Sequence, residues 1–267
     1  MVSFVATPIG NLKDITLRAL EALKQADVIF CEDTRHTIKL LNAYEIKKPL
    51  YACHKFNERS AAEKILEASR KGENVVVVSD AGTPVISDPG NTVCKVLREN
   101  GEPYTLLPGA CAFVAGLVLS ALPADRFAFI GFLPEKQSEK KALLERYKDC
   151  DLTLVFHSAP QDVDKDIKAM FETFGDRAAA AVREITKLHE ETRNFRLSEG
   201  LDGEKRGEYV LVVAGAEEKE NPLNGLSEQE HIRYYMSTGL EKKEALKRAA
   251  KDRGVSKSEL YPFSVDL

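Results

Sequence analysis

In the first 121 residues of the chain, short apolar runs alternate with amphipathic segments. The apolar runs lie at 3–7, 26–30, 49–53, 74–78 and 104–108. Between them, apolar residues recur at every third or fourth position in the segments 14–25, 37–44, 58–71 and 91–100. This alternation of strand and helix patterns predicts an α/β fold, with a mostly parallel sheet and helices on its faces. The run Val75–Val78 is apolar on both sides of its strand, which favours a central place in that sheet.

A second set of elements follows a helix pattern at 110–121 and a linker-like segment around Pro123. Strand patterns lie at 127–132, 152–157, 178–184, 192–198 and 208–215, and helix patterns at 138–148 and 162–174. The last three strands follow each other with only short connections, so we expect antiparallel pairs and a mixed sheet. After a charged break at 216–225, a helical pattern resumes. We therefore expect an N-terminal α/β domain (1–121), a C-terminal α/β domain (122–216) and a helical tail (226–267).

Composition narrows the class of protein. The longest weakly polar stretch, 110–122, has 13 residues, fewer than the roughly 20 that span a bilayer, so we expect a buried helix and no membrane partner. The N-terminus shows no basic segment followed by an apolar one, which predicts a cytoplasmic protein. The five cysteines are widely spaced and form no CxxC pair, so neither disulfides nor a metal site is expected. Since the net charge is −4, a nucleic-acid partner would require a local basic patch.

Two loops, "TPIGNLKDIT" (7–16) and "SDAGTPVISDPG" (79–90), follow predicted strands of the first sheet. In open α/β sheets, ligands bind beyond the carboxyl ends of the strands, where small residues let backbone amides approach closely. The alternative is that these prolines and glycines only form turns. Neither loop matches GxGxxG or ends in GKS or GKT, so a dinucleotide or nucleoside triphosphate held in the usual way is not expected.

Seven segments resemble, in order, the motifs of the tetrapyrrole-methylase superfamily. They are "VATPIGNLKDITLRAL", "CEDTRHT", "VVVVSDAGTPVISDPG", "LLPGACA", "GFLPEK", "VREITKLHEE" and "GEYVLVVAG". Within the superfamily they are most similar to the branch that 2'-O-methylates a cytidine of bacterial small-subunit (16S) ribosomal RNA. The resemblance covers nearly the whole chain, and "TPIGN", "EDTRHT" and "SDAGTP" together are highly specific. It implies S-adenosylmethionine bound between two α/β domains, a homodimer, and 16S rRNA within the small ribosomal subunit as partner.

The resemblance also implies site residues. Those for the cofactor are Asp80, Gly82, Thr83, Pro84, Ile86, Gly109, Cys111, Ala112, Phe156, Arg183, Glu184, Gly207 and Glu208. Those for the substrate are Pro8, Gly10, Asn11, Arg35, His36, Lys247 and Arg248. The chain departs from the pattern twice: Cys111 stands where much of the superfamily has serine, and "FHSAPQ" (156–161) stands where relatives often read "YESPHR".

Transfer of a methyl group to a ribose hydroxyl is an in-line displacement in which the cofactor supplies the activated methyl. The protein aligns the acceptor oxygen, and a nearby base that takes its proton would help. The candidates for that base are Glu32, Asp33 and His36 in "CEDTRHT" and Glu184, Lys187 and Glu190 in "VREITKLHEE". Asp33 could instead be only the N-cap of a helix at 34–43, and 182–191 only a charged edge strand. The sequence does not choose among these.

Residues 241–257 of the tail hold seven Lys/Arg against three Asp/Glu. The pattern predicts two short helices around Gly254, with Ser256 capping the second, a unit that can grip a phosphate backbone. The alternative is a solvated helix that packs on its own domain. The leading hypothesis is thus an rRNA ribose methyltransferase. A tetrapyrrole C-methyltransferase and a ribosome-binding protein without turnover are the alternatives.

Overall fold

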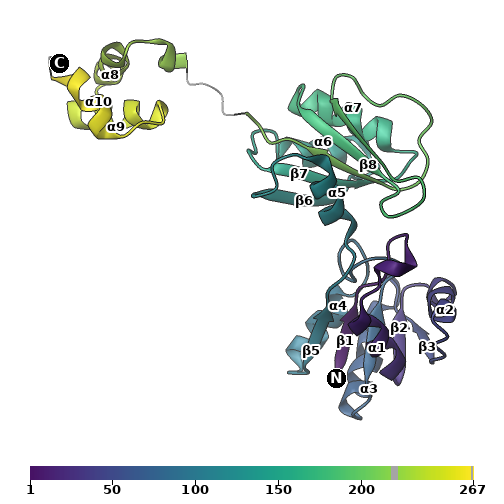
Figure 1. Cartoon of the computed structure of the whole chain (residues 1–267). Helices are drawn as coiled ribbons and strands as arrows, with labels where there is room; N and C mark the ends of the chain where they lie inside the picture. Colours follow the sequence, from purple (N-terminus) through teal and green to yellow (C-terminus); the bar gives the residue numbers. More distant parts are fainter. Residues whose placement is uncertain (218–221, 266) are drawn as a thin grey trace. The chain divides into compact units, whose positions relative to one another are not determined.

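The computed structural model describes residues 1–217, 222–265 and 267, so the charged break expected at 216–225 lies partly outside the described residues. The chain forms two compact units, Met1–Ala216 and Glu217–Leu267. The first unit contains two five-stranded sheets with helices on their faces (Figure 1). The expected α/β class, with a parallel and a mixed sheet and C-terminal helices, is confirmed. The boundary near residue 121 stays a prediction.

All strands of the first sheet are parallel, because each returns to the sheet through a helical connection. The order is β3 (Leu50–Ala52), β2 (Val28–Cys31), β4 (Val75–Val78), β1 (Val2–Val5) and β5 (Tyr104–Leu107). β4 is central and its four valines are buried, as their continuous apolar run predicts. One face is covered by α1 (Leu17–Gln25) and α2 (Thr34–Ala43), the other by α3 (Glu58–Arg70) and α4 (Asn91–Glu99).

The loops at the carboxyl edge of this sheet are tied to one another. The amide of Thr7 donates to the carbonyl of Gly82 at 2.9 Å, and the amide of Gly82 donates to the carbonyl of Thr7 at 3.0 Å. The amide of Asp33 donates to Asp80 Oδ1 at 3.0 Å. These bonds join the loops after β1, β2 and β4 into one surface.

The second sheet is mixed. Its order is β6 (Phe127–Phe132), β7 (Thr153–Ser158), β10 (Tyr209–Val213), β8 (Ala178–Arg183) and β9 (Glu191–Arg196). β6 and β7 are parallel, whereas β10 runs antiparallel to β7 and β8, and β9 to β8, as the short connections predict. The helices α6 (Gln137–Glu145) and α7 (Val163–Phe174) pack on one face. The other face is covered by α5 (Ala112–Ser120).

The expectation that 110–122 forms a buried helix is only half right. In α5, Gly116 and Leu117 are buried against the sheet, but Val114 and Val118 are 45% and 70% exposed. The helix is an outer layer, so only one side of its apolar surface is covered within the first unit. Gly116 allows the close approach, because a Cβ there would lie 2.5 Å from Cγ1 of Val210 in β10.

The second unit is a small helical cluster of α8 (Glu228–Ser237), α9 (Lys242–Asp252) and α10 (Lys257–Leu260). Ser256 caps α10 in a capping box with Glu259, which confirms the cap predicted there. The core includes His231, which is fully buried with Nε2 3.3 Å from Asp252 Oδ2. The expected helical tail is therefore present.

Candidate functional site

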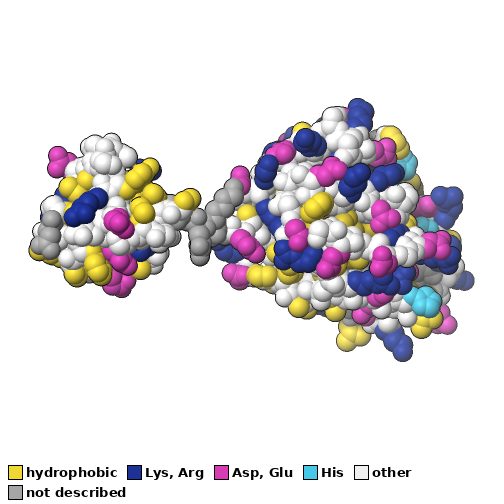
Figure 2. Space-filling model, turned by 90° about the horizontal axis from the view of Figure 1, so that it is seen from above, with side chains coloured by type: hydrophobic (Ala, Val, Ile, Leu, Met, Phe, Trp, Pro, Cys, Tyr) yellow, Lys and Arg dark blue, Asp and Glu magenta, His cyan; other side chains and the backbone are white. Residues whose placement is uncertain are grey.

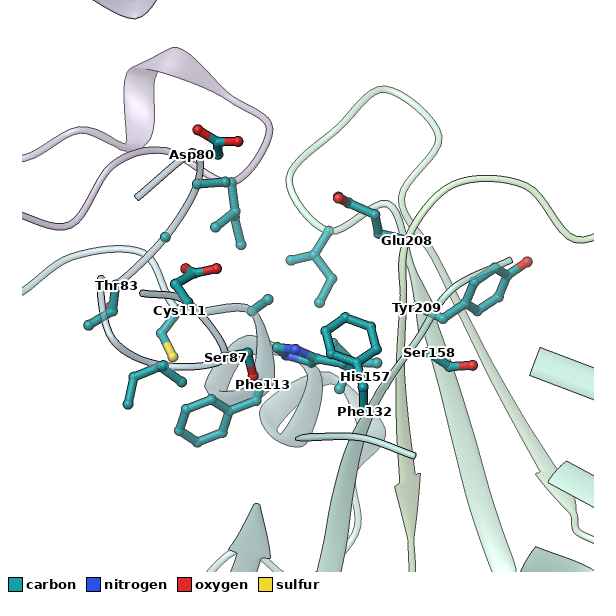
Figure 3. Close-up of a pocket in the computed structure, with 18 of the residues that line it drawn as sticks. Asp80, Thr83, Ser87, Cys111, Phe113, Phe132, His157, Ser158, Glu208 and Tyr209 are labelled. Atoms are coloured by element: carbon teal, nitrogen blue, oxygen red, sulfur yellow. The ribbon is translucent and has the colours of Figure 1, made fainter. Parts of the chain in front are cut away.

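A cavity of about 450 Å³ lies between the carboxyl edge of the first sheet and the second sheet. Figure 3 shows Asp80, Thr83 and Cys111 on one side of it, Glu208, Tyr209 and Ser158 on the other, and His157 and Phe132 between them. Its size is typical of a site for a small organic ligand. The expected residues that line it are Glu32, Asp80, Gly82, Thr83, Ile86, Cys111, Ala112 and Glu208.

Six of the expected cofactor residues, Glu184 among them, do not line the cavity. Phe156 and Pro84 are buried. Gly109 packs so closely that a Cβ added to it would lie 3.0 Å from Cβ of Ala6. Gly207 has φ of +74° and packs against the Glu184 side chain, whereas Arg183 forms an ion pair of 2.8 Å with Glu191. These residues fix the backbone behind the wall rather than forming its surface.

The loop after β4 places backbone at the surface of the cavity through Gly82. Its φ of +76° is a conformation that favours glycine, and a Cβ there would meet Ile9 Cγ2 at 3.2 Å. The next residue, Thr83, donates its hydroxyl to the carbonyl of Ala110 at 3.1 Å. The loop is thereby joined both to the loop after β1 and to the segment that leads into α5.

Three carboxylates, those of Glu32, Asp80 and Asp88, lie at the first-sheet side of the cavity. Burial raises the pKa of Glu32, and the charges of Asp88 and Asp80 raise it further. Burial is also the main cause that raises the pKa of Asp88. No Lys or Arg among the described residues forms an ion pair with Glu32 or Asp88. This side of the cavity is therefore short of positive charge and favours a cationic ligand.

The opposite side is largely apolar and contains His157, which was not among the expected site residues. Its ring lies edge-on to Phe129 and Phe132, with centroids at 5.0 and 5.2 Å. Burial lowers the pKa of the imidazole, and the charge of Glu208 opposes this only in part, so the ring is neutral near pH 7. Its Nε2 is buried and has no hydrogen-bond partner in the described part of the chain. The sequence signal that could have identified this residue is the departure from the family pattern at "FHSAPQ" (156–161).

Asp33 does not line the cavity. Its Oδ1 accepts the amide of Arg35 at 2.8 Å and caps α2, and Oδ2 pairs with the Arg35 guanidinium at 2.6 Å. These hydrogen bonds from Arg35 hold the pKa of Asp33 well below its usual range. The N-cap interpretation is therefore confirmed, and Asp33 is a poor proton acceptor. His36 Nδ1 lies 3.3 Å from Asp80 Oδ2, at the same edge of the sheet.

The segment 184–190 forms the turn between β8 and β9, not an edge strand. Lys187 Nζ pairs with Glu184 Oε1 at 2.8 Å and with Glu208 Oε2 at 2.9 Å. The hydrogen bond from Lys187 lowers the pKa of Glu184. Although burial lowers the pKa of Lys187, its bonds to the two glutamates raise it overall. Neither residue is thus available as a base in this arrangement. Glu190 Oε2 accepts the amide of Thr186 at 2.6 Å.

Of the expected substrate residues, those in the loop after β1 lie beside this turn. A Cβ on Gly10 would collide with the Lys187 side chain, and Asn11 caps a short 3₁₀ turn, Leu12–Asp14, by accepting the amide of Lys13. Pro8, Gly10 and Asn11 do not line the cavity, whereas Ile9 does. Lys247 and Arg248 are exposed on α9 of the second unit.

The chain combines a parallel sheet, a mixed sheet and a ligand-sized cavity against the loops of the parallel sheet. This combination defines a recognisable class of protein. Residues 1–200 match the family described as Tetrapyrrole (Corrin/Porphyrin) Methylases, and the chain belongs to this family. The chain is 42% identical over 266 residues to Ribosomal RNA small subunit methyltransferase I of Bacillus subtilis (strain 168), covering 96% of this chain and 91% of that protein.

Two further similarities bear on the fold. The protein of the same name from Thermotoga maritima is 39% identical over 217 residues, which are 80% of this chain and 97% of the relative. Uroporphyrin-III C-methyl transferase from Thermus thermophilus, solved in complex with S-adenyl homocysteine, superposes with a TM-score of 0.56 at 20% identity, covering 80% and 96% of the two chains. The last comparison shows a shared fold.

Within the described ranges, no helix is both long and apolar enough to cross a membrane. The same residues contain no group of three or more His, Cys, Asp or Glu that could hold a metal ion.

Proposed function

We propose that this chain is an S-adenosylmethionine-dependent methyltransferase that methylates the 2'-hydroxyl of a cytidine in 16S rRNA of the small ribosomal subunit. The observation that carries this proposal is the 42% identity, over 96% of the chain, to the Bacillus subtilis protein named as a small-subunit rRNA methyltransferase. The cavity and its charges support the same conclusion from the physical side.

The cavity fits S-adenosylmethionine in size and in charge. Its carboxylates suit the cationic sulfonium and ammonium groups, and its apolar side suits adenine. Around Gly82, Thr83 and Ala112, closely approached backbone can hold the amino-acid end, while a triphosphate would be repelled by Glu32 and Asp88. When bound, the cofactor supplies an activated methyl group and a neutral leaving group.

The chain's own residues must align the acceptor ribose, exclude water and accept one proton. Asp33, Glu184 and Lys187 are held in ion pairs, which leaves Glu32 as the candidate carboxylate that lines the cavity. We assign Glu32 as the acceptor of the 2'-hydroxyl proton. Its raised pKa matches this role, since proton transfer is most efficient when the pKa of the base is near the working pH.

Methyl-labelled S-adenosylmethionine, incubated with small subunits from a strain that lacks this methylation, tests the proposal. We expect label in a ribose-methylated cytidine after nuclease digestion, and no label in a DNA analogue, which lacks the 2'-hydroxyl. Labelling of a porphyrinogen or precorrin instead would select the tetrapyrrole alternative. Binding of cofactor and subunits without any incorporation would select a ribosome-binding protein without turnover.

Gly82→Val is expected to weaken cofactor binding roughly 10- to 100-fold, because a β-branched residue at positive φ is strained and its side chain pushes on Ile9. Isothermal titration calorimetry measures this affinity. Gly72→Val is the matched control: Gly72 has a similar φ of +85°, but a Cβ there meets no atom within 4 Å. The control should lose some stability and keep its affinity. Equal affinities for the two variants would contradict the assignment of the loop.

We also propose that the exposed basic face of α9 contacts RNA. Charge reversal of Lys247 and Arg248 should raise KM for small subunits several-fold and leave kcat unchanged. The slope of log K against the logarithm of the salt concentration should fall in magnitude by about one per lost phosphate contact. Lys64→Glu, an exposed site on α3, is the control. An unaltered salt dependence in the double variant would remove the tail from the proposal.

The homodimer and the cytoplasmic location stay predictions. The exposed apolar side of α5, with Val114 and Val118, is a surface that a second copy could cover.

A further inference from the structure

The loop 53–57 follows the edge strand β3 and ends at the same edge of the sheet as the cavity loops. It presents Phe56 to solvent with 94% of the residue exposed. The ring of His54 contacts it edge-on, with centroids 6.1 Å apart. Apart from Leu188, no other large apolar residue in the described part of the chain is exposed to such a degree. None of the proposed chemistry uses this loop.

Hydrogen bonds hold the loop in place. The side chain of Asn57 donates to the carbonyl of Ala52 at 2.9 Å and accepts the amide of His54 at 2.8 Å. Glu58, the next residue, accepts the amides of Gly90 and Thr92 at 2.7 Å each. Gly90 ends the loop that carries Gly82 and Asp88 of the cavity. Phe56 is therefore displayed from a fixed support that is bonded directly to the cavity loop.

Three lysines flank β3: Lys55 lies in the loop itself, and Lys47 and Lys48 lie in the segment that leads into the strand. Lys47, Lys48 and Lys55 have no ion-pair or hydrogen-bond partner for their ammonium groups among the described residues. A hollow of about 610 Å³ between α2 and β3 is lined by Arg35, Lys47 and Lys48 and by no acidic side chain. The face of the first unit in Figure 2 shows Lys and Arg interspersed with Asp and Glu. Cations thus lie at both ends of this edge strand, and Lys55 is next in sequence to the exposed aromatic ring.

A ring with neighbouring cations is the chemistry that binds single-stranded RNA, because every base has a face that stacks and every phosphate carries a charge. The carboxylates of Glu32, Asp80 and Asp88 repel phosphates from the cavity itself. The backbone of an RNA whose ribose enters the cavity must therefore run outside it, and the lysines before and after β3 offer a path along this edge strand.

We propose that Phe56 is a stacking platform for a base that flanks the methylated nucleotide, with Lys55 contacting the adjoining phosphate and Lys47 and Lys48, at the other end of β3, contacting phosphates further along the strand. This inference rests on the proposed function and names the part of the chain that positions its substrate. Phe56 acts on the RNA strand outside the cavity and takes no part in methyl transfer.

Phe56→Ala in the full chain tests the platform. We expect KM for small subunits to rise roughly 5- to 100-fold, as is typical for loss of one stacked base, with kcat and cofactor affinity unchanged. Phe56→Tyr and Phe56→Trp should restore KM, since they also stack. The melting temperature should not change, because the side chain is almost fully exposed. Phe171→Ala is the matched control and should keep its KM. Phe171 is a 40% exposed ring on α7, the helix that packs on the second sheet.

A second measurement separates this inference from the proposed function. Fluorescence anisotropy with a single-stranded oligoribonucleotide reports binding whether or not methylation occurs. Weaker binding by Phe56→Ala supports the platform even if the unaltered protein incorporates no label, in which case only the proposed function fails. Equal binding by Phe56→Ala and the unaltered protein, or loss that Phe56→Tyr and Phe56→Trp do not restore, overturns the platform and leaves a labelled cytidine as separate support for the function.

Discussion

Lys140→Met is expected to lower the free energy of unfolding by about 3–5 kcal/mol, because it leaves a buried carboxylate without its cation. Lys140 Nζ lies 2.5 Å from Asp166 Oδ1, and both side chains are only 4% exposed. The other oxygen, Asp166 Oδ2, accepts the hydroxyl of Ser158 at 2.6 Å. Ser158 alone cannot replace the lost charge. Urea unfolding followed by circular dichroism measures the change.

The double variant Lys140→Met, Asp166→Leu is the informative comparison. Replacing both partners of a buried ion pair by apolar residues is often neutral, so the double variant should recover most of the stability lost by the single one. Lys136→Met removes an exposed lysine of the same α6 region, paired with Glu139 at 3.0 Å, and should cost little. If all three variants lost the same stability, the burial of the pair would not explain the effect.

This ion pair also supports the cavity. Ser158 and His157 end β7 at the cavity wall, and Asp166 belongs to α7 behind it. The bond from Ser158 to Asp166 thus fixes the strand end to the helix layer. We expect Lys140→Met to loosen this wall as well as to lower global stability.

The elements of the fold were predictable because their signals are local. Four consecutive valines predict a central strand, short connections predict antiparallel pairing, and a serine three residues before a glutamate predicts the cap of α10. Each of these depends on a few neighbouring residues. The resemblance added the family, which periodicity by itself could not supply.

The candidate site was less predictable because it depends on contacts between distant segments. Lys187 binds Glu208, which lies 21 residues away, and this removes it from the candidates for a base. His157 belongs to a strand that is almost wholly buried, and its apolar run indicates burial but not that a cavity lies at its end. Asp88, which was not among the expected site residues, lines the cavity. The apolar composition of α5 likewise did not reveal that one side has no cover in the first unit.

Glu32→Gln is expected to lower kcat roughly 100- to 10,000-fold, the range typical for loss of a general base. Glutamine keeps the shape of the side chain but cannot accept the 2'-hydroxyl proton. Cofactor binding should weaken by much less, because Asp80 and Asp88 still face the cavity. Single-turnover methylation of small subunits, together with calorimetric cofactor binding, separates the two effects. Glu45→Gln, an exposed carboxylate after α2, is the control and should keep its kcat.

The pH dependence gives a second, independent test of Glu32. A base acts when deprotonated, so kcat/KM should fall as the pH drops through the pKa of Glu32. Because burial and the charges of Asp88 and Asp80 raise that pKa, the fall should occur at higher pH than for an ordinary glutamate. In Glu32→Gln the residual activity should no longer fall over this pH range. If kcat/KM of this variant still fell over the same pH range, another cavity group would have to accept the proton. The next residue to replace would then be His157, which is neutral and whose Nε2 has no partner in the described residues.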